Sequence, residues 1–190
     1  GIDWLAKRRG PDLAAQIASL TDAAMAGRVS LEDVYARRLD AVAPTVQDVA
    51  ALAEAYRVAV APGAKACVVA FQRASIRVLV VSGGLRDALI PLARDLGVAE
   101  ADVYGVGLRF AADDTYLGIE MDSPLTRDEG KSQLLQGMLH ALPRPILHVG
   151  DGMTDAVTRD VVDAFAAYTG FVRRESVVAR ADFTLDSFGA

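Results

Sequence analysis

Two short apolar runs in this chain end in glycine-rich turns, and each turn leads directly into a helix-like segment. The first run, Ile76–Val81, is rich in β-branched residues and is followed by Ser82-Gly83-Gly84. The second run, Pro145–Val149, is followed by Gly150-Asp151-Gly152. Continuous apolar runs of this length are typical of strands in parallel sheets that helices cover on both faces. The pattern therefore predicts an α/β fold in which strands alternate with helices.

The chain changes character near residue 60. Residues 1–60 show helical spacing without strand-like alternation: Pro11 begins one helix, Ser30 caps a second and Thr45 precedes a third. We therefore expect a helical-bundle cap over residues 1–60 and a Rossmann-type core, with a three-layer parallel sheet, over residues 61–190. The elements expected in the core are helices over Ala64–Arg73, Leu85–Leu96 and Lys131–Leu142, strands over Ile76–Val81, Pro145–Val149 and Ala164–Tyr168, and a β-hairpin of Val103–Phe110 and Tyr116–Met121.

Composition and charge exclude several classes of protein. The chain has 190 residues, 52% of them hydrophobic, so it can bury a substantial core. Its net charge of -5 and its lack of a long basic run argue against nucleic acid as a partner. No apolar run reaches the roughly 18 residues that a membrane span requires. Because Cys67 is the single cysteine, a disulfide framework is excluded, and we expect a cytoplasmic location.

Two carboxylates stand one helical turn apart where the second apolar run ends. Asp151 lies between two glycines, and Asp155 follows in the next helix, so both side chains can face the same site. Mg²⁺ takes one or two carboxylates together with waters and phosphate oxygens, which makes this pair a candidate metal site. The alternative is structural: Asp151 as a turn residue and Asp155 as an acid favoured by the helix dipole.

Candidate anion-binding groups lie after the first run and at the start of a later helix. Ser82-Gly83-Gly84 can present a hydroxyl and free backbone N–H groups to phosphate oxygens. Lys131 begins a helix, where a cation opposes the dipole, which points to a task such as binding phosphate. The alternatives are a serine cap with turn glycines and a solvated lysine. His148 lies in the second apolar run and is interpreted as a core histidine.

Taken together and in chain order, these motifs resemble those of the haloacid dehalogenase superfamily of phosphohydrolases, and within it the phosphoserine phosphatases. The motifs are Val81–Gly84, Gly130-Lys131 and Gly150–Asp155. The opening segment Gly1–Lys7 is similar to the one that follows the family's first motif. The segment Ala24–Leu39 is similar to its helical cap. The resemblance implies a haloacid dehalogenase-like core with a cap domain.

The resemblance also implies roles at the phosphate end of the site. Ser82, helped by the backbone of Gly83, would bind the transferring phosphoryl group. Lys131 would neutralise its charge and hold the nucleophile, and Thr154 would sit beside it. Asp151 would ligate Mg²⁺.

Further residues are implied to complete the site. Asp155 would support the water shell of the metal or the active-site network. Arg38 matches the position that grips the substrate carboxylate, a task that suits a guanidinium group. Met25 matches a residue that lines the substrate pocket, and Gly84 would also contact the substrate. The position that is aromatic in phosphoserine phosphatases matches Leu31 here, which weakens the assignment of the substrate but not of the reaction.

One motif of the family is absent from this sequence. Asp-x-Asp-x-Thr/Val supplies the nucleophile and the general acid and base, and it belongs just before Gly1. The strand that carries it would lie between those ending at Ser82 and Asp151. Omitting a central strand would leave buried backbone groups unpaired, at about 1–3 kcal/mol each. We therefore expect an upstream extension of roughly 15 residues or more, and we expect the chain as given to be catalytically inactive.

The resulting expectation is a Mg²⁺-dependent phosphomonoesterase that forms an aspartyl-phosphate and converts L-phosphoserine to L-serine and phosphate. One alternative keeps the reaction class but changes the substrate to another small phosphorylated metabolite, or transfers the phosphoryl group to an acceptor. A second alternative is a module without a nucleophile that only binds phosphorylated ligands. The expected partner is a small phosphorylated metabolite, and the expected assembly is a monomer or a homodimer.

Overall fold

The computed structural model describes residues 1–25, 28–120 and 123–189. None of the helices in these ranges is long and apolar enough to cross a lipid bilayer. The α-helices are α1 (Ile2–Arg9), α2 (Pro11–Met25), α3 (Leu31–Val42), α4 (Val46–Val58), α5 (Ala64–Arg73), α6 (Arg86–Leu96), α7 (Gly130–Met138), α8 (Met153–Ala156) and α9 (Glu175–Val178). The strands are β1 (Val80–Leu85), β2 (Val103–Val106), β3 (Leu108–Phe110), β4 (Tyr116–Ile119), β5 (Leu147–Gly150), β6 (Ala164–Tyr168) and β7 (Phe183–Leu185). The 3₁₀ turns are η1 (Glu100–Asp102), η2 (Pro124–Thr126), η3 (Leu139–Ala141) and η4 (Val157–Asp160).

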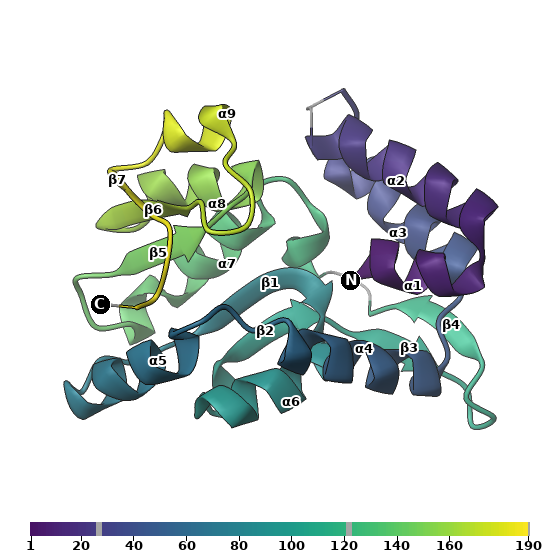
Figure 1. Ribbon diagram of the computed structural model, residues 1–190, viewed down its shortest axis with the longest axis horizontal. Coiled ribbons are helices and arrows are strands. Elements are labelled where there is room, and N and C mark those ends of the chain that lie inside the picture. Colours follow the sequence, from purple (N-terminus) through teal and green to yellow (C-terminus); the bar gives the residue numbers. More distant parts are fainter. Residues whose placement is uncertain (26–27, 121–122, 190) are drawn as a thin grey trace.

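The strands of the described residues form two parallel sheets and one antiparallel hairpin. β1 pairs with β2, β3 pairs with β4, and β5, β6 and β7 pair side by side in that order. Figure 1 shows β5–β7 with α8 and α9 on one side of the molecule and α1–α3 on the other, with β1 between and beneath them. The parallel strands and the helices around them confirm the predicted α/β fold. The upstream strand expected between β1 and β5 stays a prediction.

The first parallel strand lies further along the chain than its apolar run suggested. The prediction was Ile76–Val81, but the strand begins at Val80, which pairs with Val103 at the start of β2. A strand needs a hydrogen-bonded neighbour, and in the described ranges β2 offers none for the residues before Val80. The ladder is then irregular up to Leu85, so that Ser82–Gly84 form a bulge inside the strand instead of ending it.

Only half of the predicted hairpin is observed. β3 and β4 do form an antiparallel pair, but β2, the first half of the expected hairpin strand, pairs with β1 in parallel. Val103 is 2% exposed in an apolar cluster with residues of α6, and Val106 is completely buried in the cluster shared with the N-terminal helices. Alternation along the chain shows that residues are extended, but it does not show which strand is their neighbour.

The remaining predicted elements differ mainly at their ends. The helix expected over Lys131–Leu142 ends at Met138 and continues as the turn η3. The strands expected at Pro145–Val149 and Ala164–Tyr168 are observed as β5 and β6. The strand β7 was not predicted, because three residues are too few to show a period.

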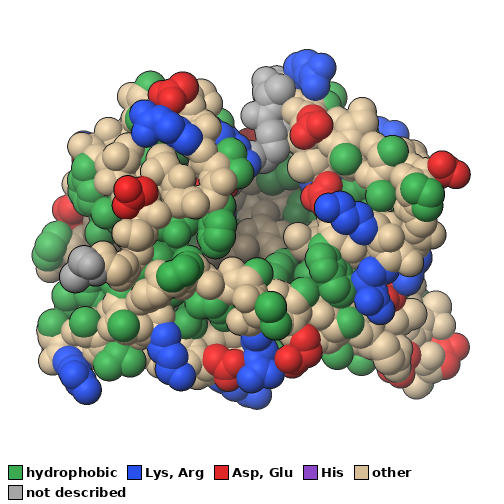
Figure 2. Space-filling view, in the orientation of Figure 1, with side chains coloured by type: hydrophobic (Ala, Val, Ile, Leu, Met, Phe, Trp, Pro, Cys, Tyr) green, Lys and Arg blue, Asp and Glu red, His purple; other side chains and the backbone are tan. Residues whose placement is uncertain are grey.

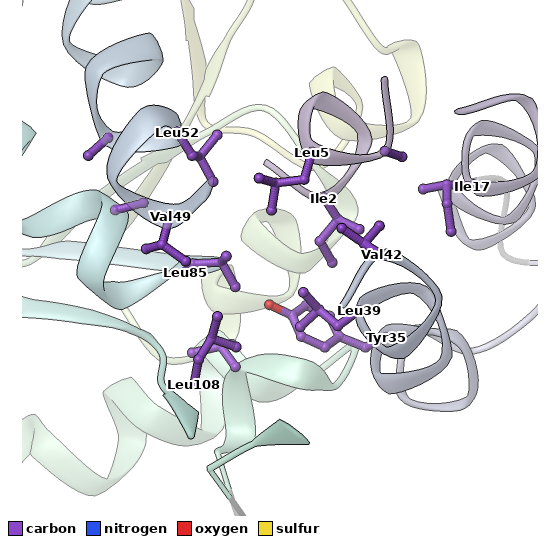
Figure 3. Close-up of a cluster of buried hydrophobic side chains, with 14 of the residues drawn as sticks. Ile2, Leu5, Ile17, Tyr35, Leu39, Val42, Val49, Leu52, Leu85 and Leu108 are labelled. Carbon is purple, nitrogen blue, oxygen red and sulfur yellow. The ribbon is translucent and has the colours of Figure 1, made fainter. Parts of the chain in front are cut away.

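One buried apolar cluster joins the N-terminal helices to the first parallel sheet. Figure 3 shows side chains of α1–α4 meeting Leu85 and Leu108 in this cluster. Leu39 and Leu52 are completely buried within it. Each Å² of apolar surface removed from water contributes about 25 cal/mol, so this cluster holds the helices on the sheet. The cluster crosses residue 60, and the division into a cap of residues 1–60 and a core of residues 61–190 stays a prediction.

A second apolar cluster connects the two parallel sheets through α7. Leu135 of α7 is buried in a cluster with Leu142 and Val162, and Val81 of β1 and Ile146, which precedes β5, pack against this cluster. Since β1 and β5 do not pair with each other in the described ranges, this cluster fixes the spacing between them.

The start of α4 is held by a buried carboxylate. Asp48 is 6% exposed, and its Oδ2 accepts hydrogen bonds from the N–H and the hydroxyl of Thr45 and from the Arg9 guanidinium. The Asp48 N–H in turn donates to the Thr45 hydroxyl at 3.1 Å, which completes a capping box. Burial raises the pKa of Asp48, but the hydrogen bonds from Arg9 and Thr45 outweigh burial and lower it to about 2.

We expect Asp48→Ala to lower the free energy of unfolding by about 2–3 kcal/mol at pH 7, because it removes a cap and leaves Arg9 without its partner. The carboxylate stabilises the fold fully above its unfolded pKa near 3.8, and this contribution is lost as the pH falls toward 2. Urea unfolding at pH 7 and in acid measures both effects. The control is Glu54→Ala on the same helix, an exposed partner of Arg57 whose loss should cost less than about 0.5 kcal/mol. Equal losses for the two variants would contradict this account.

Candidate active site

The bulge in β1 forms the first part of the site. Ser82 is half-buried, and its hydroxyl oxygen accepts a hydrogen bond from the Gly84 N–H at 3.0 Å. Because the oxygen already serves as an acceptor here, the hydroxyl hydrogen can be donated to an anion. The structure therefore places Ser82, Gly83 and Gly84 in the bulge near the carboxyl end of β1, and ligands of parallel sheets bind at that end of the strands.

Asp155 is the centre of a buried charged cluster formed by β5, α7 and α8. Its Oδ1 accepts a hydrogen bond from Lys131 Nζ at 2.6 Å and lies 2.8 Å from His148 Nε2, while its Oδ2 accepts from the Gly152 N–H at 3.1 Å. The side chains of Asp155, Lys131 and His148 are 7%, 14% and 11% exposed. Burial raises the pKa of Asp155, but His148 and Lys131 outweigh burial and lower it to about 2. The predicted site residues Lys131 and Asp155 are therefore in direct contact, as a charged pair.

Two glycines make room for this cluster. A Cβ at Gly150, the last residue of β5, would lie 2.1 Å from Cγ of Asp155. A Cβ at Gly130, the first residue of α7, would lie 1.7 Å from the carbonyl oxygen of Pro124. Real Cβ atoms do not approach other atoms this closely, so neither position accepts a larger residue without a shift of its neighbours. Gly150 therefore leaves room for the Asp155 carboxylate, and Gly130 lets the start of α7 pack against η2.

Asp151, the predicted metal ligand, lies on the open side of the cluster. Its side chain is 52% exposed, and its Oδ2 accepts a hydrogen bond from Arg174 Nη1 at 2.5 Å. Arg174 also donates to the Asp151 carbonyl oxygen at 3.0 Å, so the guanidinium holds the turn as well as the carboxylate. Thr154 lies half-buried in the first turn of α8, between Asp151 and Asp155 in the chain.

Arg38 of α3 is a nearly buried guanidinium with hydrogen-bonding capacity to spare. It is 6% exposed, and its Nη2 donates to Oδ2 of Asp3 at 3.1 Å. The other oxygen of Asp3 accepts a hydrogen bond from the Thr21 hydroxyl at 2.7 Å, which orients the carboxylate. Within the described residues, the buried Nε of Arg38 has no hydrogen-bond partner, an arrangement suited to a further anionic acceptor. Met25 ends α2, and its side chain lies outside the described part of the chain.

The turn η2 contacts both segments that carry the phosphate-binding candidates. A Cβ at Gly83 would lie 3.2 Å from the Leu125 carbonyl oxygen, and the start of α7 packs against Pro124 of the same turn. No hydrogen bond joins Ser82 to Lys131 within the described residues, so η2 and the apolar cluster beneath them set their separation. Figure 2 shows that the molecule is hollowed on this face, between the side formed by β5–β7, α8 and α9 and the side formed by α1–α3.

Sequence reasoning missed three contacts in this region. His148 is hydrogen-bonded, as expected of a core histidine, but its partner is the site carboxylate Asp155. Alternation along β5 puts His148 and Gly150 on the same face, and this signal could have revealed the contact. Arg174 and Tyr35 reach the site from distant parts of the chain, and no local pattern marks them.

Comparison with known proteins identifies the family. A model of the family described as haloacid dehalogenase-like hydrolase matches residues 2–157. The chain is 31% identical to the chloroplastic phosphoserine phosphatase of Arabidopsis thaliana, over 99% of this chain and 64% of that protein. It is 28% identical to the phosphoserine phosphatase of Mus musculus, over 99% of this chain and 83% of that protein. The chain thus spans less than two thirds of the plant relative and most of the mouse relative.

Solved structures share the fold. A phosphoserine phosphohydrolase-like protein from Francisella tularensis superposes with a TM-score of 0.87 at 19% identity, over 97% of this chain and 88% of that one. A phosphoserine phosphatase solved as an analogue of its phospho-aspartyl intermediate superposes with a TM-score of 0.77 at 20% identity, over 98% of this chain and 86% of that one. These structures support the fold, and the family match shows that the chain belongs to the haloacid dehalogenase-like hydrolases.

Proposed function

We propose that this protein is a phosphomonoesterase that hydrolyses L-phosphoserine through an aspartyl-phosphate intermediate. The observation that carries the proposal is that the Ser82–Gly84 segment of β1 and the start of α7, which carries the buried pair of Lys131 and Asp155, both pack against η2. Its reaction class is supported by the family match and by the phosphoserine phosphatases to which the chain is similar.

The phosphate end of the substrate is assigned to β1 and α7. Ser82 would donate its hydroxyl hydrogen to a phosphate oxygen, and the backbone of Gly83 and Gly84 would contribute N–H groups. Lys131 would neutralise part of the phosphate charge from its place beside Asp155, and Thr154 would add a hydroxyl from α8. The ion pair with Asp155 keeps Lys131 in one position before a substrate arrives, so less entropy is lost on binding.

The amino-acid end of the substrate is assigned to the cap. The carboxylate of phosphoserine would bind Arg38, whose Nε has no partner among the described residues and whose Nη2 is oriented by Asp3. Met25 remains a candidate for lining this pocket, because it ends the helix that packs against α3.

A Mg²⁺ ion fits the chemistry of Asp151. This ion accepts one or two carboxylates with waters and phosphate oxygens, and Asp151 offers an exposed carboxylate beside the phosphate candidates. Among the described residues, no group of three or more His, Cys, Asp or Glu side chains could hold a metal by itself. When bound, the ion would offset negative charge on the transferring phosphoryl group. The geometry of Arg174 allows it to hold the same carboxylate when no metal is bound.

The nucleophile in this proposal is an aspartate on a strand that lies between β1 and β5. The proposal is supported by the two separate parallel sheets, because β1 and β5 each have a strand neighbour on one side only within the described ranges. The cytoplasmic location of the protein and its assembly as a monomer or homodimer stay predictions.

A second candidate substrate is another small phosphorylated metabolite. The leucine side chain at position 31 favours this alternative. Leu31 packs against the apolar cluster that contains Tyr35 and Leu39, at a place where phosphoserine phosphatases carry an aromatic residue. A smaller side chain there leaves room for a substrate of a different shape.

The substrate assignment is tested with two phosphate esters that differ in one group. The protein, expressed with its native upstream sequence and supplied with Mg²⁺, should hydrolyse phosphoserine more efficiently than phosphoethanolamine, which lacks the carboxylate. Arg38→Ala should lower kcat/KM for phosphoserine by about tenfold to 100-fold, the range expected for charge-assisted hydrogen bonds, and leave phosphoethanolamine nearly unchanged.

The control for this test is Arg37→Ala, which removes the exposed neighbouring guanidinium. This variant should keep the wild-type kcat/KM for both esters. Equal losses on both esters would refute the carboxylate contact and favour the second substrate class. Failure to release phosphate from any ester of a broad panel would refute the phosphatase itself.

The ion pair at the phosphate end makes a separate prediction about acidity. Lys131→Met should raise the pKa of Asp155 from about 2 toward or above its ordinary value of 3.8, as followed by NMR of the carboxyl carbon. The ionised carboxylate stabilises the fold above pH 4 or so and loses this effect as the pH falls toward 2. The variant should therefore be about 3 kcal/mol less stable at neutral pH and differ less from the wild type in acid.

Lys65→Met, which removes an exposed lysine of α5, serves as the control. It should change neither the pKa of Asp155 nor the free energy of unfolding. A pKa that stays near 2 in Lys131→Met would show that His148 and the Gly152 N–H hold the carboxylate without the lysine.

A further inference from the structure

A tyrosine of the cap reaches into the anion-binding turn. The hydroxyl of Tyr35, on α3, donates a hydrogen bond to the carbonyl oxygen of Gly83 at 2.6 Å. Tyr35 is 3% exposed, and Figure 3 shows its ring beside Leu39 with the hydroxyl directed away from its own helix. Burial raises the pKa of Tyr35 above its ordinary value, so the hydroxyl keeps its proton and remains a donor at neutral pH.

This hydrogen bond acts on a peptide group that is held at its other end as well. The peptide that joins Gly83 to Gly84 has its carbonyl oxygen bound by Tyr35, and its N–H donates to the Ser82 hydroxyl oxygen. Two successive glycines leave such a peptide free to rotate, because neither residue has a Cβ to restrict it. The two hydrogen bonds from opposite sides therefore select one orientation out of several that the backbone allows.

The selected orientation of the peptide determines whether the Ser82 hydroxyl can donate its hydrogen to an anion. While the Gly84 N–H occupies an acceptor site on the hydroxyl oxygen, the hydroxyl hydrogen points elsewhere and can be donated. If the peptide rotated, its carbonyl oxygen would be free to turn toward the site, where an anion would be repelled. We propose that Tyr35 is a positioning residue that holds the Gly83–Gly84 peptide in its anion-binding orientation. The proposed function supplies the identity of the anion, a phosphate group, and the proposal rests on it for that.

Tyr35 lies on a helix, α3, that also contacts other segments of the candidate site. Arg38 lies three residues further along the same helix, so the two side chains share a face. The first residue of the helix, Leu31, donates its N–H to the Asp128 carboxylate, and Glu32 pairs with Arg127 at 3.3 Å. α3 thus contacts both the bulge in β1 and the loop that leads to Lys131. Tyr35 thereby connects the helix that carries the carboxylate-binding candidate to the turn that carries the phosphate-binding one.

Tyr35→Phe removes only the hydroxyl and keeps the buried ring. We expect hydrogen exchange of the Gly84 amide in the intact protein to become about fivefold faster, the factor that corresponds to one net hydrogen bond of about 1 kcal/mol. The dissociation constant for orthophosphate, measured by calorimetry with Mg²⁺ present, should rise by a similar factor. Exchange of the core amides of Leu39 and Leu52 should change much less.

Tyr116→Phe is the matched control. Tyr116 of β4 also joins the core to α3 through its hydroxyl, which donates to Asp40 at 3.2 Å, and among the described residues this hydroxyl makes no hydrogen bond to Ser82–Gly84. It should leave both Gly84 exchange and the orthophosphate constant unchanged. The proposal is overturned if Tyr35→Phe leaves Gly84 exchange unchanged, or if it accelerates core and turn amides equally, as a purely structural role would.

Different results would refute the proposed function and the role of Tyr35. If the wild-type protein binds neither orthophosphate nor phosphoserine, the proposed function is refuted. The response of Gly84 exchange to the two tyrosine variants then still decides whether Tyr35 orients the peptide.

Discussion

The buried carboxylate of Asp155 is the interaction on which the site depends. It joins the end of β5, the start of α7 and the first turn of α8, because it accepts hydrogen bonds from Lys131 and the Gly152 N–H and contacts His148. A buried charge of this kind is stable only when its partners are all in place. The same constraint therefore gives Lys131 one position, and it explains why Gly150 carries no side chain.

The N-terminal helices and the first parallel sheet are connected in two ways. Apolar side chains of α1–α4 share one buried cluster with the first sheet, which supplies most of the cohesion between them. Polar contacts from α3 then set the finer geometry, through Tyr35 to the bulge in β1 and through Leu31 to the loop before α7. Arg38 lies on the same helix. A substrate that bound both Arg38 and Ser82 would therefore stabilise the contact between α3 and β1 that already exists in the free protein.

The sequence predicts features that depend on local patterns, but it does not predict features that depend on contacts between distant residues. The α/β class followed from apolar runs and glycines, whereas the roles of Ser82, Lys131 and Asp151 stay predictions. The start of β1 and the partner of β2 did not follow from the sequence, because strand pairing depends on neighbours that periodicity does not reveal. Arg174, which binds Asp151 from 23 positions away, gave no signal in the motif that it completes.

The central claim is that the ends of β1, α7 and β5 form one phosphate site. An NMR titration of the protein with phosphoserine and Mg²⁺ tests it most directly, through the backbone amides of Gly84, Lys131 and Gly152. We predict that all three resonances shift together with one dissociation constant, and that Lys131→Met weakens binding at all three. Shifts that follow different constants, or that appear at one segment alone, would contradict the claim.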